Sequence, residues 1–91
     1  MSESAKHIIF TGQVQGVGFR FTAFNMANRY QLTGLVRNLI DGSVEMITQG
    51  TNDDIDICIS EIKSSFSDCI IETKIEEVPY NPKYKDFKIT F

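Results

Sequence analysis

A glycine-rich run near the start of the chain has the residue types of an anion-binding loop. Gly12, Gly16 and Gly18 interrupt an apolar segment, and Arg20 follows where a helical pattern begins. Glycine lets successive backbone N–H groups turn toward one point, and a helix N-terminus adds unpaired N–H groups and a positive dipole end. Arginine adds a planar, permanently charged fork that matches phosphate oxygens. The run therefore predicts a cradle for an anion, in particular for a phosphoryl group.

The elements that must position this run follow from the spacing of the apolar residues. The expected order is strand, helix, strand, strand, helix, strand, strand, over residues 8–11, 20–30, 35–38, 43–48, 52–66, 70–76 and 87–91. Asp41-Gly42 is a hairpin turn signal, Thr51 or Asn52 can cap the second helix, and Gly34 is expected to end the first.

This order favours the α+β class and a ferredoxin-like βαββαβ sandwich. Its sheet is mainly antiparallel, with two helices on one face and a short C-terminal strand. The 91 residues are expected to form a single domain, 1–91, in which the polar residues 1–6 are a flexible N-terminal tail.

Several other side chains are interpreted as structural. The Phe21/Phe24 pair and the stripe ending at Phe66 are core positions, as is Cys58. The side chain of Arg37 is expected on the opposite face of its strand from Asn38, as a solvated charge. His7, at the start of a strand, is expected to be exposed. Two groups of acidic residues are also given structural roles. Charges at the start of the second helix are expected for Asp53, Asp54 and Asp56, and a solvated strand face for Glu72, Glu76 and Glu77.

Charge and composition limit the partners. The net charge of −3 argues against a nucleic-acid binder, which needs a basic face, but allows a small anionic substrate in one focused pocket. The N-terminus lacks the pattern of a signal peptide and no apolar run has transmembrane length, so a cytoplasmic protein without a membrane partner is expected. One histidine and two separated cysteines offer no metal-ligand cluster. A monomer is expected.

Two long motifs together resemble the acylphosphatase family. The first, Gly-x-Val-Gln-Gly-Val-x-Phe-Arg, is matched by Gly12, Val14, Gln15, Gly16, Val17, Phe19 and Arg20. The second, Gly-aromatic-small-x-Asn-x-x-x-Gly-x-Val followed by a further glycine, is matched by Gly34, Val36, Asn38, Gly42, Val44 and Gly50. Leu35 replaces the usual aromatic residue, which is a packing element in the family. The likeness extends to the chain length and to the closing Tyr84, Phe87 and Ile89.

The resemblance implies an enzyme that hydrolyses carboxyl phosphates to a carboxylate and inorganic phosphate, with no metal, no cofactor and no phosphoenzyme. It implies that Arg20 and Asn38 are catalytic: Arg20 binds the phosphoryl group and Asn38 orients the attacking water. The implied phosphate-binding positions, acting through their backbone N–H groups, are Gln15, Gly16, Val17, Gly18, Phe19 and Arg20.

The residue types suit this chemistry. The leaving group of a mixed anhydride is a weakly basic carboxylate, so the enzyme mainly has to place water in line and stabilise charge on the phosphoryl oxygens. Neither motif contains an evident general base. The hypothesis is therefore that a phosphate oxygen of the substrate, or bulk water, takes the proton.

Two other functions remain open from the residues. One is a non-catalytic module that binds acyl or carbamoyl phosphate, because related domains occur inside larger carbamoyl-phosphate-processing proteins. The other is an RNA-binding sheet of the same fold, which would need exposed aromatic residues on central strands with basic neighbours. Retention of both Arg20 and Asn38 favours catalysis. Acetyl phosphate, carbamoyl phosphate and bisphosphoglycerate share the acyl-phosphate group, so the motifs define the substrate class rather than one substrate.

Overall fold

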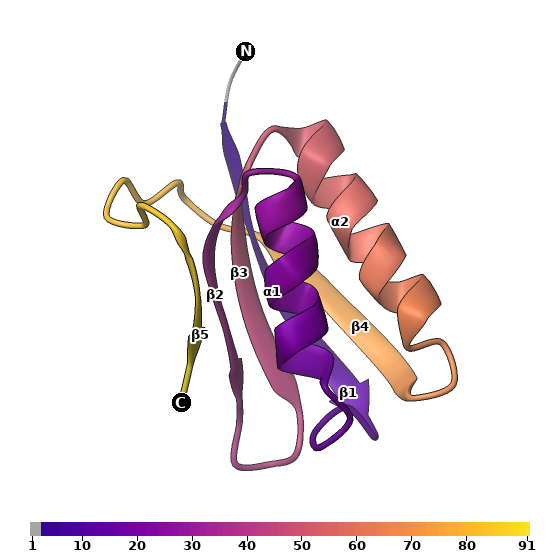
Figure 1. Cartoon of the computed structure of the whole chain (residues 1–91). Helices are drawn as coiled ribbons and strands as arrows, with labels where there is room; N and C mark the ends of the chain where they lie inside the picture. The colour runs from indigo at the N-terminus through magenta and orange to yellow at the C-terminus, as the bar shows by residue number, and fades with distance from the viewer. Residues whose placement is uncertain (1–2) are drawn as a thin grey trace.

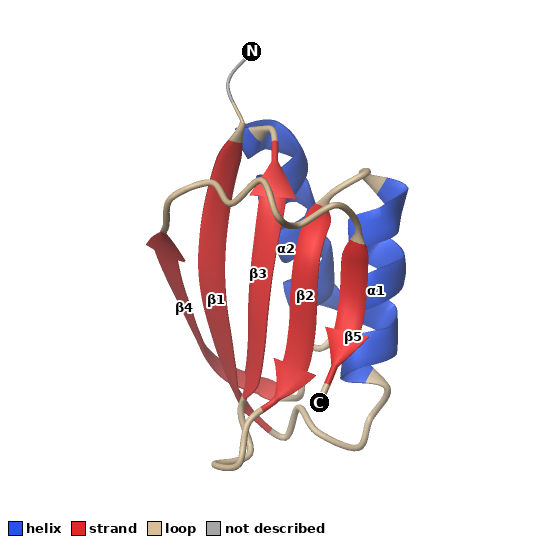
Figure 2. Cartoon of the chain, turned by 90° about the vertical axis from the view of Figure 1, so that its left-hand side faces the viewer, coloured by secondary structure: helices blue, strands red, loops and turns tan. Residues whose placement is uncertain are grey.

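Five strands form one sheet, and two helices cover one of its faces (Figures 1 and 2). The computed structural model describes residues 3–91, and its elements are β1 (Ser4–Gly12), α1 (Phe19–Arg29), β2 (Thr33–Asn38), β3 (Val44–Gly50), α2 (Asn52–Ser65), β4 (Ile70–Glu77) and β5 (Phe87–Thr90). The strand order is β4-β1-β3-β2-β5, antiparallel throughout except for the parallel pair β2–β5. The prediction of a ferredoxin-like α+β fold with an added C-terminal strand is confirmed.

The strand β1 begins earlier than the sequence suggested. Ser4 already pairs with Gly50 of β3, Ala5 is buried, and Lys6 pairs with residues of both neighbouring strands. The ammonium group of Lys6 also lies 2.9 Å from Asp56 Oδ1 on α2. The prediction of a flexible tail is therefore wrong for residues 4–6, because pairing with β3 and the burial of Ala5 hold this segment in the sheet. Residues 1–2 lie outside the described part.

The end of α1 also differs from expectation. The helix ends at Arg29, and the chain reverses at Gln31, whose φ of 57° lies in the left-handed region. The N–H group of Leu32 then donates to Ala27 O, which closes the turn. Gly34, expected to end the helix, instead lies within β2, where a Cβ atom would collide with the carbonyl oxygen of Ile47.

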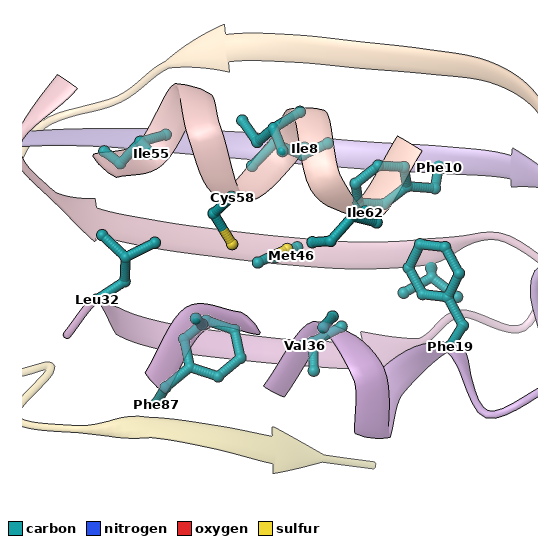
Figure 3. Close-up of a cluster of buried hydrophobic side chains, with 14 of the residues drawn as sticks. Ile8, Phe10, Phe19, Leu32, Val36, Met46, Ile55, Cys58, Ile62 and Phe87 are labelled. Carbon is teal, nitrogen blue, oxygen red and sulfur yellow. The ribbon is translucent and has the colours of Figure 1, made fainter. Parts of the chain in front are cut away.

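The core lies between the sheet and the helices and includes Phe19, the first residue of α1 (Figure 3). The Phe19 ring lies 4.9 Å from the Phe10 ring and 4.6 Å from the Phe66 ring, centroid to centroid. Burial of such a side chain contributes about 1.5–3 kcal/mol to stability. The start of α1, and with it the loop that precedes it, is therefore fixed against β1.

The expectation that Phe21 is a core residue is wrong. Its side chain is 63% exposed, whereas Phe19, Ala23 and Ala27 form the buried face of α1. Phe21 follows Phe19 by two residues, which places it about 200° around the helix, away from the sheet. Phe24 and Phe66 do pack against the core, and Cys58 is buried. Burial raises the pKa of the Cys58 thiol to about 12, which suits a core residue.

The other face of the sheet carries a charged cluster around Glu45 of β3. His7 Nε2 of β1 lies 2.7 Å from Glu45 Oε2, and Arg37 Nε of β2 lies 2.5 Å from Glu45 Oε1. Arg37 is thus exposed, as expected, but paired, while His7 is partly buried rather than exposed. Burial raises the pKa of Glu45, but the hydrogen bonds from His7 and Arg37 outweigh it and hold this pKa below the ordinary value.

This cluster predicts acid sensitivity of the fold. The carboxyl of Glu45 has a lower pKa in the folded than in the unfolded chain, so the unfolded chain binds more protons and stability falls as the pH drops below about 4–5. In urea titrations, we expect the free energy of unfolding of Glu45→Gln to fall less on acidification than that of the wild type. Glu72→Gln, on an exposed carboxylate without an ion pair in the described residues, is the control. Identical acid sensitivity of wild type and Glu45→Gln would contradict the prediction.

No helix among residues 3–91 has the length and apolar character needed to cross a membrane.

Candidate active site

The glycine-rich loop, residues 13–18, connects β1 to α1 at the end of the sheet where the β2–β3 turn also lies (Figure 1). Gly16 and Gly18 both have a φ of 79°, and the space where their Cβ atoms would stand is open. None of the backbone N–H groups of residues 15–19 has a hydrogen-bond acceptor within the described chain. The loop therefore presents a row of free donors.

The N-termini of the two helices differ in a way that suits this loop. In α2, the hydroxyl of Thr51 accepts a hydrogen bond from the Asp54 N–H, and Asp53 and Asp54 lie in the first turn. In α1, Gly18 is the cap, no side chain caps the helix, and the first turn holds no acidic residue. The positive end of α1 is thus left without an anionic side chain.

Arg20, the second residue of α1, lies against the last strand. Its Nη1 donates to Thr90 O over 3.4 Å, and its guanidinium carbon lies 5.3 Å from the centre of the Phe91 ring. Both contacts come from β5 and the residue after it, which run parallel to β2. These contacts hold the guanidinium next to the loop. Its hydrogen bond to Thr90 O is long, so a bound anion can replace it.

Asn38 is the last residue of β2 and is paired with Val44 of β3. It lies on the helix side of the sheet, because Val36, two residues earlier, is fully buried there. Its side-chain oxygen Oδ1 is buried and has no hydrogen-bond partner in the part of the chain that the structure describes. A buried acceptor without a partner destabilises a protein by about 1–3 kcal/mol, so this oxygen is suited to accept a hydrogen bond from a bound molecule.

One pocket of about 200 Å³ is lined by both Arg20 and Asn38. Its other lining residues are Val14, Gly16, Gly18, Phe19, Phe21, Ile89 and Phe91. No aspartate, glutamate or histidine is among them. A larger groove of about 500 Å³ lies between α1 and α2, but it contains none of the motif residues.

The side chains of the remaining motif residues do not line this pocket. Val17 is 46% exposed on the loop, and the side chain of Gln15 points toward the β2–β3 turn, where its amide donates to backbone oxygens. Asp41 is the carboxylate inside the second motif, and it accepts hydrogen bonds from the hydroxyl and N–H groups of Ser43. The hydroxyl bond, above all, holds the pKa of Asp41 below its ordinary value. Asp41 therefore stabilises the turn, and it does not line the pocket.

Sequence reasoning missed the apolar wall of the pocket, which is formed by Phe21, Ile89 and Phe91. Nothing in the two motifs marks Ile89 or Phe91, because they reach the pocket through the parallel β2–β5 pairing. The exposure of Phe21 could have been recognised from its two-residue separation from Phe19 on a helix. Among residues 3–91, no group of three or more histidine, cysteine, aspartate or glutamate side chains could hold a metal ion.

Comparison with known proteins agrees with this geometry. The family model described as Acylphosphatase matches residues 6–89. An acylphosphatase of Chlorobaculum tepidum is 37% identical over 90 residues, which cover 98% of each chain. The crystal structure of acylphosphatase from Bacillus subtilis matches with a TM-score of 0.89 and 29% identity, over 97% of this chain and 99% of that one. Full-length HypF, in a phosphate- and nucleotide-bound form, matches with a TM-score of 0.86 and 38% identity, over 99% of this chain but 12% of that one.

The fold and the pocket define a class: small α+β domains with a glycine-rich loop and an arginine at the start of the first helix. The family model spans most of the chain, and the chain covers 93% and 98% of the length of two curated acylphosphatases that are 37% identical to it. The chain therefore belongs to the acylphosphatase family and is an acylphosphatase enzyme.

Proposed function

We propose that this chain cleaves acyl phosphates by in-line attack of a water molecule that Asn38 orients. The phosphoryl group is held by Arg20 and by the backbone N–H groups of residues 15–20. The observation that carries the proposal is the buried, unpartnered Oδ1 of Asn38 in the same pocket as Arg20. An amide can accept a hydrogen bond from the water through this oxygen and donate one to the substrate through its NH₂ group.

The chemistry needs charge stabilisation more than proton transfer. The water oxygen bonds to phosphorus while the bond from phosphorus to the carboxylate oxygen breaks, and the electron pair leaves with the carboxylate. Donors that are already in place stabilise the charge on the phosphoryl oxygens. Because no carboxylate or imidazole lines the pocket, the water proton passes to a phosphate oxygen or to bulk water. A basic limb in the pH profile of kcat that vanished on replacing one carboxylate would contradict this step.

The alternative is a domain that binds an acyl or carbamoyl phosphate without cleaving it. The match to a small part of HypF shows that this fold also occurs within a longer protein. The unpartnered Asn38 oxygen favours catalysis, because binding alone requires only the cradle and Arg20. We further propose a metal-independent, monomeric and cytoplasmic enzyme.

The test is release of inorganic phosphate from acetyl phosphate, with and without a chelator. We expect catalytic release at the same rate in both conditions, because the proposed donors are all protein groups. Tight binding without release would identify a sensing module. Loss of activity on chelation, restored by a divalent cation, would overturn the metal-independent mechanism.

A further inference from the structure

The side chain of Gln15 leaves the loop and reaches the turn that follows Asn38. Its Nε2 donates to Leu39 O over 2.7 Å and to Ser43 O over 2.9 Å. Both partners are carbonyl oxygens, which fixes the orientation of the amide with its nitrogen toward the turn. The side chain is partly buried.

The two carbonyls lie at the end of the β2–β3 hairpin. Leu39 O also accepts from the Gly42 N–H over 3.2 Å, and Ser43 O accepts from the Leu39 N–H over 2.9 Å. Leu39 directly follows Asn38, and Ser43 directly precedes Val44, the strand partner of Asn38. Gln15 thus bonds to both ends of the hairpin turn, at the residue after β2 and at the residue before β3.

Within residues 3–91, these two bonds are the only hydrogen bonds between the loop 13–18 and the turn 39–43. The loop supplies the donors for the phosphoryl group and the turn fixes the end of β2. Their separation sets the distance between a bound phosphoryl group and a water held by Asn38. In-line attack depends strongly on that distance, and a misplacement of about 1 Å can reduce the rate on the order of 10²-fold.

We propose that Gln15 is a positioning residue that sets Asn38 against the phosphate cradle. This rests on the proposed function, because it assigns Gln15 to the alignment of the water with the substrate. The side chain of Gln15 acts through Asn38, while the N–H group of Gln15 stays in the cradle, so loss of the side chain affects the chemical step and leaves phosphate binding intact.

Gln49 offers a matched control for a purely structural role. It is buried, its Nε2 donates to Asn81 O over 2.9 Å, and its Oε1 accepts from the Asn81 N–H over 2.6 Å. Gln49 therefore also joins a loop to the sheet through two backbone bonds, but outside the pocket. Gln15→Met and Gln49→Met each remove two hydrogen bonds to backbone groups, with little change in side-chain volume.

The first measurement compares kcat for acetyl phosphate with the inhibition constant of inorganic phosphate. We expect Gln15→Met to lower kcat on the order of 10²-fold and to change the inhibition constant by less than about twofold. Gln49→Met is expected to lower the unfolding midpoint and to leave kcat unchanged. Equal weakening of phosphate inhibition and kcat in Gln15→Met would overturn the proposal and make the side chain of Gln15 part of the cradle.

The second measurement is a double-mutant cycle with Asn38→Ala. If Gln15 acts through Asn38, adding Gln15→Met to Asn38→Ala has no further effect on kcat. If the two substitutions lower kcat independently, so that their effects multiply, Gln15 does not position Asn38 and the proposal fails. Gln15→Asn, whose shorter amide cannot span both carbonyls, replaces Gln15→Met if the latter does not fold.

A third measurement separates this proposal from the proposed function. The side-chain NH₂ resonances of Asn38, recorded by NMR without substrate, are expected to shift in the Gln15 variant and to stay in place in Gln49→Met. If the wild type hydrolyses no carboxyl phosphate, the proposed function fails, while a shift of these resonances still supports the link between Gln15 and Asn38. Unchanged Asn38 resonances in the Gln15 variant would overturn the link.

Discussion

Arg20→Lys is expected to fold normally and to lose most of its affinity for inorganic phosphate. Lysine keeps the charge but replaces a planar fork by a single ammonium group, so one of two parallel hydrogen bonds to the phosphate is lost. A hydrogen bond to a charged group contributes about 1.5–3 kcal/mol, which corresponds to roughly a 10- to 100-fold rise in the inhibition constant of phosphate and in KM.

The structure adds a reason why the fold should survive this change. Arg20 has one long contact to Thr90 O and a stacking contact with Phe91, both at the surface of the pocket. Arg29→Lys is the matched control, because Arg29 lies exposed on the same helix and pairs with the partly buried Glu61. Its KM should equal that of the wild type. A normal KM for Arg20→Lys would contradict the role assigned to the guanidinium.

Asn38→Ala is expected to bind inorganic phosphate almost normally and to lose kcat by about 10²- to 10³-fold. The cradle and Arg20 remain, but no group holds the water, and removal of one such positioned polar group has an effect of this size in other hydrolases. Because the substitution also removes a buried oxygen without a partner, the free energy of unfolding should stay equal or rise.

Thr48→Val separates the effect of losing a buried oxygen on stability from the effect of losing Asn38 on kcat. Thr48 is fully buried, and its hydroxyl also lacks a partner among the described residues, but it does not line the pocket. Thr48→Val should therefore preserve stability, as Asn38→Ala does, without changing kcat. Urea titrations and steady-state kinetics on both variants check the pair. Equal losses of phosphate binding and kcat in Asn38→Ala would instead make Asn38 a binding or folding residue.

Much of the fold was predictable because its signals are local. The Asp41-Gly42 turn, the Thr51 cap and the alternation of Phe87 and Ile89 each reflect the conformation of a few neighbouring residues. The extent of β1 was not predictable in the same way. Residues 4–6 have no strand pattern of their own, and their pairing with β3, far away in the sequence, holds them as a strand.

The candidate site also has a part that local motifs predict and a part that only non-local contacts create. The two motifs identify Arg20 and Asn38, and the structure brings both to one pocket. The motifs name Gln15 but do not indicate that its side chain and its backbone have different roles. The side chain points to the turn at residues 39–43, while the N–H group stays with the loop. Phe91 enters the pocket through a parallel strand pair, which no local pattern of residues indicates.

The contact of Arg20 with Thr90 joins residues that are 70 positions apart. Residues 13–50 already hold the loop, the first helix and the hairpin, yet the guanidinium is placed only when β5 docks beside β2. Closing so long a loop has an entropic cost that delays non-local pairing, so this strand is expected among the later elements to form. In a refolding experiment, recovery of phosphate binding would then lag behind the formation of helix α1 and report the docking of the last strand.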